Sequence, residues 1–261
     1  MVSFSANSEK AAERHSKTYL GSHWKGVKMK LGWMIAGATV VTGVFVSRLV
    51  RRPGAKIEPA TQVGSKSQMN LDRKVVIPTA MATASIALWM KMSHGNTLKY
   101  TFVPSMAASW AMYMVTYRKR MPDPKRVTAF YLLALAWQLV HFVEENSTGF
   151  RYRWPVEIFG AKPYGDRQYV AINALSYAIF IAGGVALMKK RPEFSLPAIF
   201  FAIMGVMYNG VQHPIYSYMV KSYFPGLFTG IVDLVIGPLL LRRMFDMSER
   251  SSSMAEVPVA A

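Results

Sequence analysis

The chain has 261 residues, of which 52% are apolar and only 17% are charged. Soluble domains carry about 25% charged residues, so this composition favours a membrane as the solvent for much of the chain. The sequence contains no cysteine, which excludes disulfides, iron–sulfur clusters, thiolate zinc sites and cysteine nucleophiles.

The net charge of +17 comes from basic residues that are spread along the chain rather than gathered in one segment. They form short clusters between apolar runs, at residues 51–52, 118–120, 189–191 and 242–243. Such clusters are typical of the flanks of membrane spans and favour anionic lipid surfaces. A nucleic-acid partner is not expected, because these residues would be divided among many loops.

Apolar runs close to the length of a transmembrane helix predict an all-α fold, a multi-pass bundle of about seven spans. In chain order these runs are residues 31–49, 75–90, 102–117, 127–143, 169–188, 194–212 and 224–241. Proline and basic residues punctuate the gaps between the runs, which we therefore interpret as loops.

The runs divide the chain into four regions. Residues 1–50 hold a basic tail and a first anchor, and residues 51–74 form a polar linker. A six-span helical core follows at 75–245, and residues 246–261 form a polar tail. Lysine and arginine are most frequent in the loops after the first, third and fifth runs and in this tail. The positive-inside rule places those loops in the cytoplasm or its organellar equivalent, with the N-terminus on the other face.

This topology places the polar residues of two runs on the same membrane face. His141, Glu144 and Glu145 lie at the end of the fourth run, and Asn209 and His213 lie at the end of the sixth. Residues three or four positions apart share one face of a helix, so each group projects together. Polar side chains are costly in membrane segments, which favours a functional site where these groups meet.

The seventh run begins at the same face and carries a stripe of small residues with one acid. Gly226, Gly230, Asp233 and Gly237 fall on one side of the expected helix, with Thr229 one turn before Asp233. Small residues at this spacing let helices approach closely. Asp233 is therefore expected to face the bundle interior, where a membrane carboxylate finds a partner or water.

Three motifs, in this order, resemble those of the HXXEE-motif integral membrane proteins of bacteria and eukaryotes, whose function is not established. The His-x-x-Glu-Glu motif corresponds to residues 141–145, the Asn-x-x-x-His motif to 209–213, and the Tyr-x-Pro-Gly-x-x-Thr motif to 223–229. The resemblance covers residues 127–245 and leaves 1–125 without a counterpart. It implies a membrane protein but brings no known reaction.

Two chemistries fit these residues. Two imidazoles and a carboxylate, from His141, Glu144 and His213, can hold a divalent metal such as zinc or iron with positions open for water or substrate. Alternatively, a pair of carboxylates in a site of low dielectric constant can supply one proton donor and one acceptor. The candidate catalytic residues are Glu144, Glu145, Asn209, Tyr223, Thr229 and Asp233.

The same residues also allow a purely structural interpretation, without any chemistry. Glu144 and Glu145 can pair with Arg151, Arg153 or Arg167 at the membrane surface. The sixth helix is expected to end at His213, because a residue before a proline tends to leave the helix.

Three function classes stay open, so whether the protein is an enzyme is not fixed. The first is a metal-dependent or acid–base enzyme acting on a lipid-like substrate. The second is an accessory subunit of a larger organellar membrane complex, such as a mitochondrial respiratory complex. The third is a proton-coupled transporter, which would use acids such as Asp233 as relays. The expected location is a membrane, with the mitochondrial inner membrane as one candidate, and the expected partners are membrane lipids and other membrane subunits.

Overall fold

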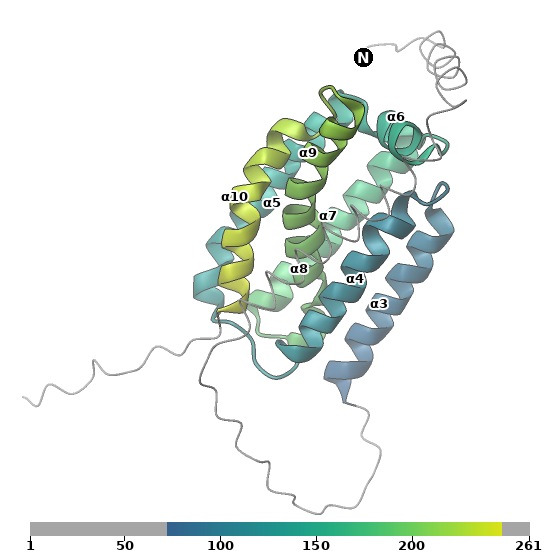
Figure 1. Ribbon diagram of the computed structural model, residues 1–261. Helices are drawn as coiled ribbons and strands as arrows, with labels where there is room; N and C mark the ends of the chain where they lie inside the picture. Colours follow the sequence, from purple (N-terminus) through teal and green to yellow (C-terminus); the bar gives the residue numbers. More distant parts are fainter. Residues whose placement is uncertain (1–71, 247–261) are drawn as a thin grey trace, which may run out of the picture.

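The computed structural model describes residues 72–246, which are helical and contain no β-strand (Figure 1). The predicted all-α class is therefore confirmed for this part of the chain. The predicted basic tail and first anchor, nearly all of the linker, and the C-terminal tail from residue 247 onward lie outside the described residues.

Antiparallel helices form a bundle in which each long segment runs opposite to the one before it (Figure 1). The elements are α3 (Arg73–Met92), α4 (Thr97–Val115), α5 (Pro124–Ser147), α6 (Phe150–Arg153), η1 (Trp154–Ile158), α7 (Asp166–Met188), η2 (Pro192–Phe194), α8 (Leu196–Phe200), η3 (Phe201–Tyr208), α9 (Asn209–Val220) and α10 (Leu227–Phe245). The apolar runs expected between residues 75 and 241 each coincide with one long helix or with the continuous segment α8–η3–α9.

Local sequence signals set the start of α5, the helix that carries the His-x-x-Glu-Glu motif. The Asp123 side chain accepts a hydrogen bond from the Lys125 backbone N–H, and Pro124 occupies the first helical position. The helix then continues to Ser147, so the motif lies within its last two turns rather than in a loop.

The sixth helical segment is longer than the sequence predicts. It was expected to end at His213, but α9 continues through Pro214 to Val220. A proline inside a helix removes one backbone hydrogen bond. Packing of the buried side chains of His213 and Tyr216 holds the segment helical despite that loss.

Close backbone contacts position α10 against η3 and α9. A side chain at Gly237 would lie 2.9 Å from the Met207 backbone, and one at Gly210 would lie 2.8 Å from the Leu234 backbone nitrogen. Asp233 is fully buried on the same side of α10. The predicted inward face of this helix is therefore confirmed, and the small residues let the helices approach as expected.

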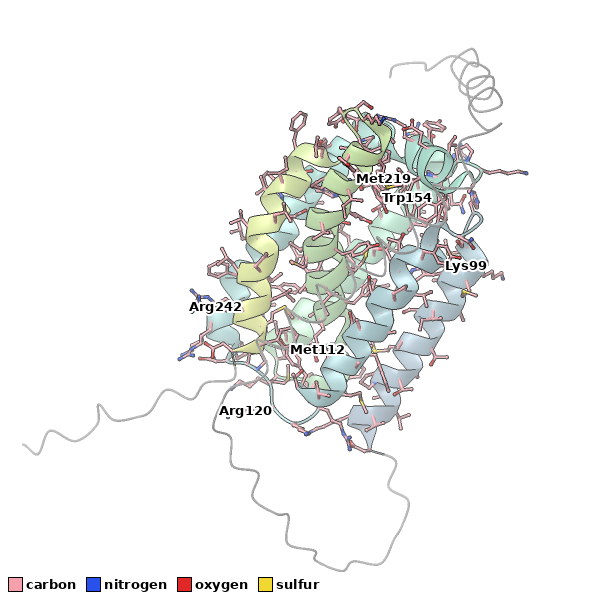
Figure 2. The ribbon with its side chains drawn as sticks, in the orientation of Figure 1. Lys99, Met112, Arg120, Trp154, Met219 and Arg242 are labelled. Carbon is pink, nitrogen blue, oxygen red and sulfur yellow. The ribbon has the colours of Figure 1, made fainter. Side chains whose placement is uncertain are left out.

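Three helices, α3, α5 and α7, are long and apolar enough to cross a membrane. The expected seven-span arrangement therefore stays a prediction. Arg120 and Arg242 lie toward one end of the bundle, whereas Trp154 and Met219 lie toward the other, near α6 (Figure 2).

Candidate metal centre

Two histidines and one glutamate meet at the end of the bundle near α6. His141 and Glu145 are one turn apart on α5, and His213 faces them from α9. Both imidazoles are 0% exposed and Glu145 is 7% exposed. The C-terminal end of α5 and the middle of α9 thus bring three ligand-type side chains into one buried cluster.

The distances within this cluster suit a metal ion. Glu145 Oε1 lies 3.4 Å from His141 Nε2 and 3.4 Å from His213 Nε2. The three ligand atoms all lie within 4.8 Å of one another. Ligands about 2.0–2.1 Å from a tetrahedral zinc ion are about 3.3–3.4 Å apart, so both glutamate–histidine distances match an edge of such a tetrahedron.

The second ring nitrogen of His213 fixes which nitrogen carries the proton. His213 Nδ1 lies 2.7 Å from the Pro225 carbonyl oxygen, which can only accept a hydrogen bond. Nδ1 therefore donates, and in the neutral ring Nε2 keeps a lone pair. This lone pair faces Glu145.

His141 is held in the same way by a relay of two hydrogen bonds. The Thr229 hydroxyl donates to Glu144 Oε2 over 2.5 Å, so its oxygen accepts the bond from His141 Nδ1, which is 2.7 Å away. In the neutral ring, the Nε2 atom of His141 then also carries a lone pair that can coordinate a metal ion. Histidines that bind metals are oriented by this kind of bond at the other ring nitrogen.

With both rings neutral, three acceptor atoms face one another. Within the described part of the chain, neither His141 Nε2 nor His213 Nε2 has a hydrogen-bond partner. Glu145 is oriented by the Tyr169 hydroxyl, which donates to Oε2 over 2.9 Å and leaves Oε1 directed at the histidines. Buried lone pairs without a donor are costly, so a cation at this point would stabilise the arrangement.

Glu144 has a different role from its neighbour. Its carboxylate accepts hydrogen bonds from the backbone N–H groups of Phe228 and Thr229 at 3.2 and 2.9 Å, and from the Tyr223 hydroxyl at 2.8 Å. Burial raises the pKa of the Tyr223 phenol, which therefore keeps the proton that it donates. Glu144 thus caps the N-terminus of α10, where a negative charge is stabilising.

The ligand set that the geometry offers therefore differs from the predicted one. The sequence pattern groups His141, Glu144 and His213, whereas the structure brings Glu145 to the two imidazoles. The reason is rotational, since residues i and i+1 project about 100° apart on a helix. The i,i+4 residue of His141 is Glu145, and Glu144 points toward α10 instead.

Glu144 and Glu145 do not pair with the nearby arginines, so the alternative structural interpretation is wrong on this point. Arg151 pairs with Asp166 at 2.6 Å and Arg153 with Glu157 at 2.7 Å. Arg153 also donates to the Tyr223 carbonyl oxygen over 2.9 Å and so holds the segment before α10 in place.

Asp233 lies beside the cluster, one turn after Thr229. Its Oδ2 is 3.9 Å from His141 Nδ1, and neither of its carboxyl oxygens has a hydrogen-bond partner among the described residues.

Asn209, another predicted site residue, makes its hydrogen bonds away from the His–Glu–His cluster. Its amide donates to the Gly205 carbonyl and its oxygen accepts from Gln212, so its polar groups serve the η3–α9 junction.

Gly226 is required where the chain enters α10. Its φ of 85° lies in the left-handed region that favours glycine. A side chain there would also enter the space of the His213 ring. The Pro-Gly pair of the third motif therefore supplies the carbonyl that binds His213 and the space that its ring needs.

An aromatic cluster covers the site and was not predicted from the sequence. Phe150 lies 5.4 Å from the His213 ring and packs against Trp154, Tyr169 and Phe224. Tyr169 was also missed as a partner of Glu145. Its place at the start of the fifth run, on the face where the predicted topology also puts the motifs, is the signal that could have identified it.

Over residues 72–246, the fold and the site define an all-helical bundle with a buried His–Glu–His cluster at one end. Residues 131–240 match the model of the family described as "Protein of unknown function with HXXEE motif", which confirms the predicted resemblance. This range includes every side chain of the cluster and of its hydrogen-bond partners. No curated protein and no solved structure matches the chain.

Proposed function

We propose that the protein is an integral membrane metalloenzyme that holds a divalent zinc or iron ion and acts on a lipid-like substrate. The metal ligands are His141 Nε2, His213 Nε2 and Glu145 Oε1. The observation that carries this proposal is that two buried imidazole nitrogens without a hydrogen-bond partner among the described residues converge on Glu145 Oε1.

A metal ion fits this convergence better than a proton does. One shared proton can join only two of the three acceptors and would leave the third lone pair unsatisfied. A metal ion satisfies all three, and the 3.4 Å distances suit tetrahedral coordination. The bonds from the Nδ1 atoms to Thr229 and Pro225 hold both imidazoles in the tautomer that a metal requires.

The number of protein ligands favours catalysis over a purely structural role. Structural zinc sites are closed by four protein ligands, whereas catalytic sites keep one position open. Residues 72–246 supply three ligands. A bound metal would act as a Lewis acid at the open position. Asp233, which lies beside His141 and has no hydrogen-bond partner among the described residues, would accept or donate the proton in such a reaction.

The surface of the bundle supports a membrane location and an apolar substrate. Leu132, Leu139 and Val143 are exposed on the outward face of α5. The same helix carries His141 and Glu145 on its inward face. Large apolar side chains in such positions suit lipid tails. The basic cluster at 118–120 and the one at 242–243 end α4 and α10 at the far end of the bundle from the site.

The test is a metal analysis of the full chain purified in detergent without added chelator. We expect about one zinc or iron ion per chain in the wild type, by the three-ligand geometry, and loss of that metal in His213→Ala and Glu145→Gln. His94→Ala is the matched control, because His94 is bound to the Lys162 and Pro163 carbonyls. A wild type purified without metal, or variants that retain it, would contradict the metal site.

The enzymatic part of the proposal needs a separate comparison. Host cells that produce the wild type are compared with cells that produce equal amounts of folded Glu145→Gln. We expect at least one membrane lipid species to change in abundance only with the wild type. If the lipid profiles are identical and the metal is confirmed, the protein binds a metal in the membrane but the proposed enzymatic activity is rejected.

A further inference from the structure

A groove lies between α3 and α7, two of the three helices that are long and apolar enough to cross a membrane. Its volume is about 400 Å³. One wall is formed by α7, the other by Met81 of α3, and the buried Pro197 of α8 lies at its base. Ile179 and Val185, which line it from α7, are exposed. In a membrane, this groove would therefore face lipid.

The packing of α7 explains why the groove is there. Gly183 brings α7 close to α8, because a side chain at this position would lie 2.6 Å from the Ala198 backbone nitrogen. The main contacts of α3 are with α4 and η2, so α3 stands beside α7 without filling the space between them. Ala182 and Ala186 line that space with methyl groups, which leave it open.

Two basic side chains lie at one end of this groove. The positions of Ile179, Ala182, Ala186 and Lys189 differ by three or four residues, so Lys189 continues the stripe of α7 that lines the groove. Arg191 lines the same groove just after the helix. Both basic residues are exposed. An apolar groove with a cationic end therefore fits an amphiphile with an anionic head.

The charge at this end is available to an anion. Residues 189–193 carry three basic side chains and one acidic one. Arg191 Nε donates to Glu193 Oε1 over 3.0 Å. This pair orients the guanidinium, which has five N–H donors and keeps others for a phosphate.

The length of the groove matches one leaflet of a bilayer. From Ile179 to Lys189, α7 rises about 15 Å, which is about half of the 30 Å hydrocarbon core. An acyl chain lying along the groove would have its headgroup at the level of Lys189 and Arg191. Basic pockets between membrane helices bind anionic lipid headgroups in this way.

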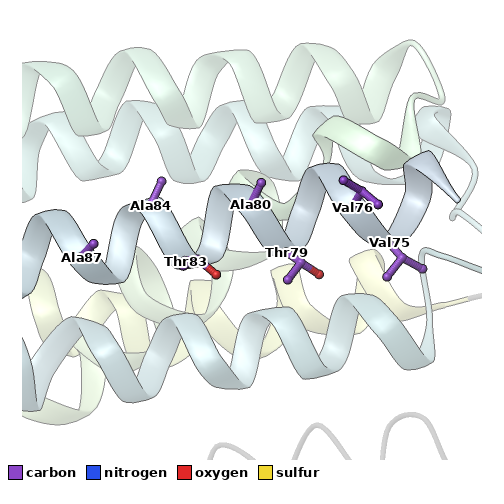
Figure 3. Close-up of a pocket in the computed structure, with 7 residues that line it drawn as sticks. All are labelled: Val75, Val76, Thr79, Ala80, Thr83, Ala84 and Ala87. Atoms are coloured by element: carbon purple, nitrogen blue, oxygen red, sulfur yellow. The ribbon is translucent and has the colours of Figure 1, made fainter. Parts of the chain in front are cut away.

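A larger hollow along α3 has no such end. Its volume is about 630 Å³, and apolar and threonine side chains between Val75 and Ala87 line it without a charged group (Figure 3). No group there favours one occupant over another, so we assign it none.

We propose that the groove between α3 and α7 binds one anionic phospholipid, with an acyl chain along α7 and the phosphate on Lys189 and Arg191. The inference rests on the membrane location in the proposed function and is independent of the metal.

Lipid titration followed by native mass spectrometry tests this site in the full chain purified in detergent. The wild type should bind one phosphatidylglycerol about fivefold more tightly than phosphatidylcholine, as expected for cations at a headgroup. Lys189→Gln/Arg191→Gln should remove this preference. The matched control is Arg242→Gln/Arg243→Gln, which removes the same charge from the last turn of α10, outside the groove, and should keep the preference.

A second pair of variants tests the acyl-chain part of the groove. Ala182→Phe fills the groove and keeps both charges, so it should weaken the binding of both lipids. Ala174→Phe is the control, because Ala174 is exposed on α7 and does not line the groove. Glycerol 3-phosphate carries the anion without acyl chains and should not displace phosphatidylglycerol. Circular dichroism confirms that each variant is folded.

The contrary outcomes are distinct from one another. Equal affinity of the wild type for the two lipids, or unchanged binding in Ala182→Phe, would overturn the lipid site. Displacement by glycerol 3-phosphate would also overturn it, because an anion alone would then be the ligand. A chain that purifies without detergent would contradict the membrane location itself. Glu145→Gln should bind phosphatidylglycerol as the wild type does, so loss of the metal does not affect this test.

Discussion

Glu144 and Glu145 are consecutive on α5, but their carboxylates have different partners. Glu145 Oε1 faces the two histidines at 3.4 Å, whereas Glu144 accepts hydrogen bonds from the start of α10. The two sites are joined through Thr229, whose hydroxyl connects Glu144 to His141. In the proposed metal site, one of the two glutamates would therefore be a ligand and the other would orient the ligand His141.

Replacing each glutamate by glutamine should separate these roles. Glu145→Gln should abolish metal binding, because a neutral amide is a poor ligand at that position. Glu144→Gln should retain the metal and destabilise the fold by about 1–2 kcal/mol, since the charge at the N-terminus of α10 is lost. Metal content and thermal unfolding in detergent measure the two effects. Equal metal loss in both variants would contradict the assignment.

Removal of the Thr229 hydroxyl should weaken metal binding without removing a ligand. Thr229→Val keeps the shape of the side chain but breaks the link between His141 and Glu144. Partners of this kind change metal affinity by about 10–100-fold. Thr229→Ser should restore most of the affinity, because it keeps the hydroxyl. Competition with a zinc-binding dye gives the affinities, and an unchanged value for Thr229→Val would rule out the relay.

A methyl group at Gly226 should disturb both the fold and the site. Gly226→Ala places a side chain at a φ of 85° and against the His213 ring. We expect a loss of about 1–3 kcal/mol from backbone strain, together with reduced metal content. Gly165→Ala is the control, because a side chain there meets nothing within 4 Å. If both variants unfold at the same temperature, the close approach at Gly226 is not needed.

Tyr169 should act on the metal through Glu145. In Tyr169→Phe the donor to Glu145 Oε2 is lost, so the carboxylate is free to rotate, and metal affinity should fall about tenfold. Tyr177→Phe removes another hydroxyl from α7, one that donates to the Leu135 carbonyl. This control should cost about 1 kcal/mol of stability and leave metal affinity unchanged. The prediction fails if the two variants bind metal equally well.

The sequence by itself determined the helices and the end of the bundle at which the motifs meet. Apolar runs located the long helical segments between α3 and α10, but not α6 and η1, because burial in a bilayer or a helical core is a property of consecutive residues. The inward side of α10 followed from the spacing of Gly226, Gly230 and Asp233, because helical periodicity is local. The family motifs were also readable without any structure, and residues 131–240 match that family.

Tertiary structure decided which groups act together. Spacing alone gave no choice between Glu144 and Glu145, because that choice depends on the rotation of α5 about its axis, which packing against α9 and α10 sets. The part played by Tyr169 comes from another helix, and the Pro225 carbonyl that orients His213 comes from a loop. The continuation of α9 beyond Pro214 was likewise decided by packing, because burial of Tyr216 outweighs the local tendency of proline to end a helix.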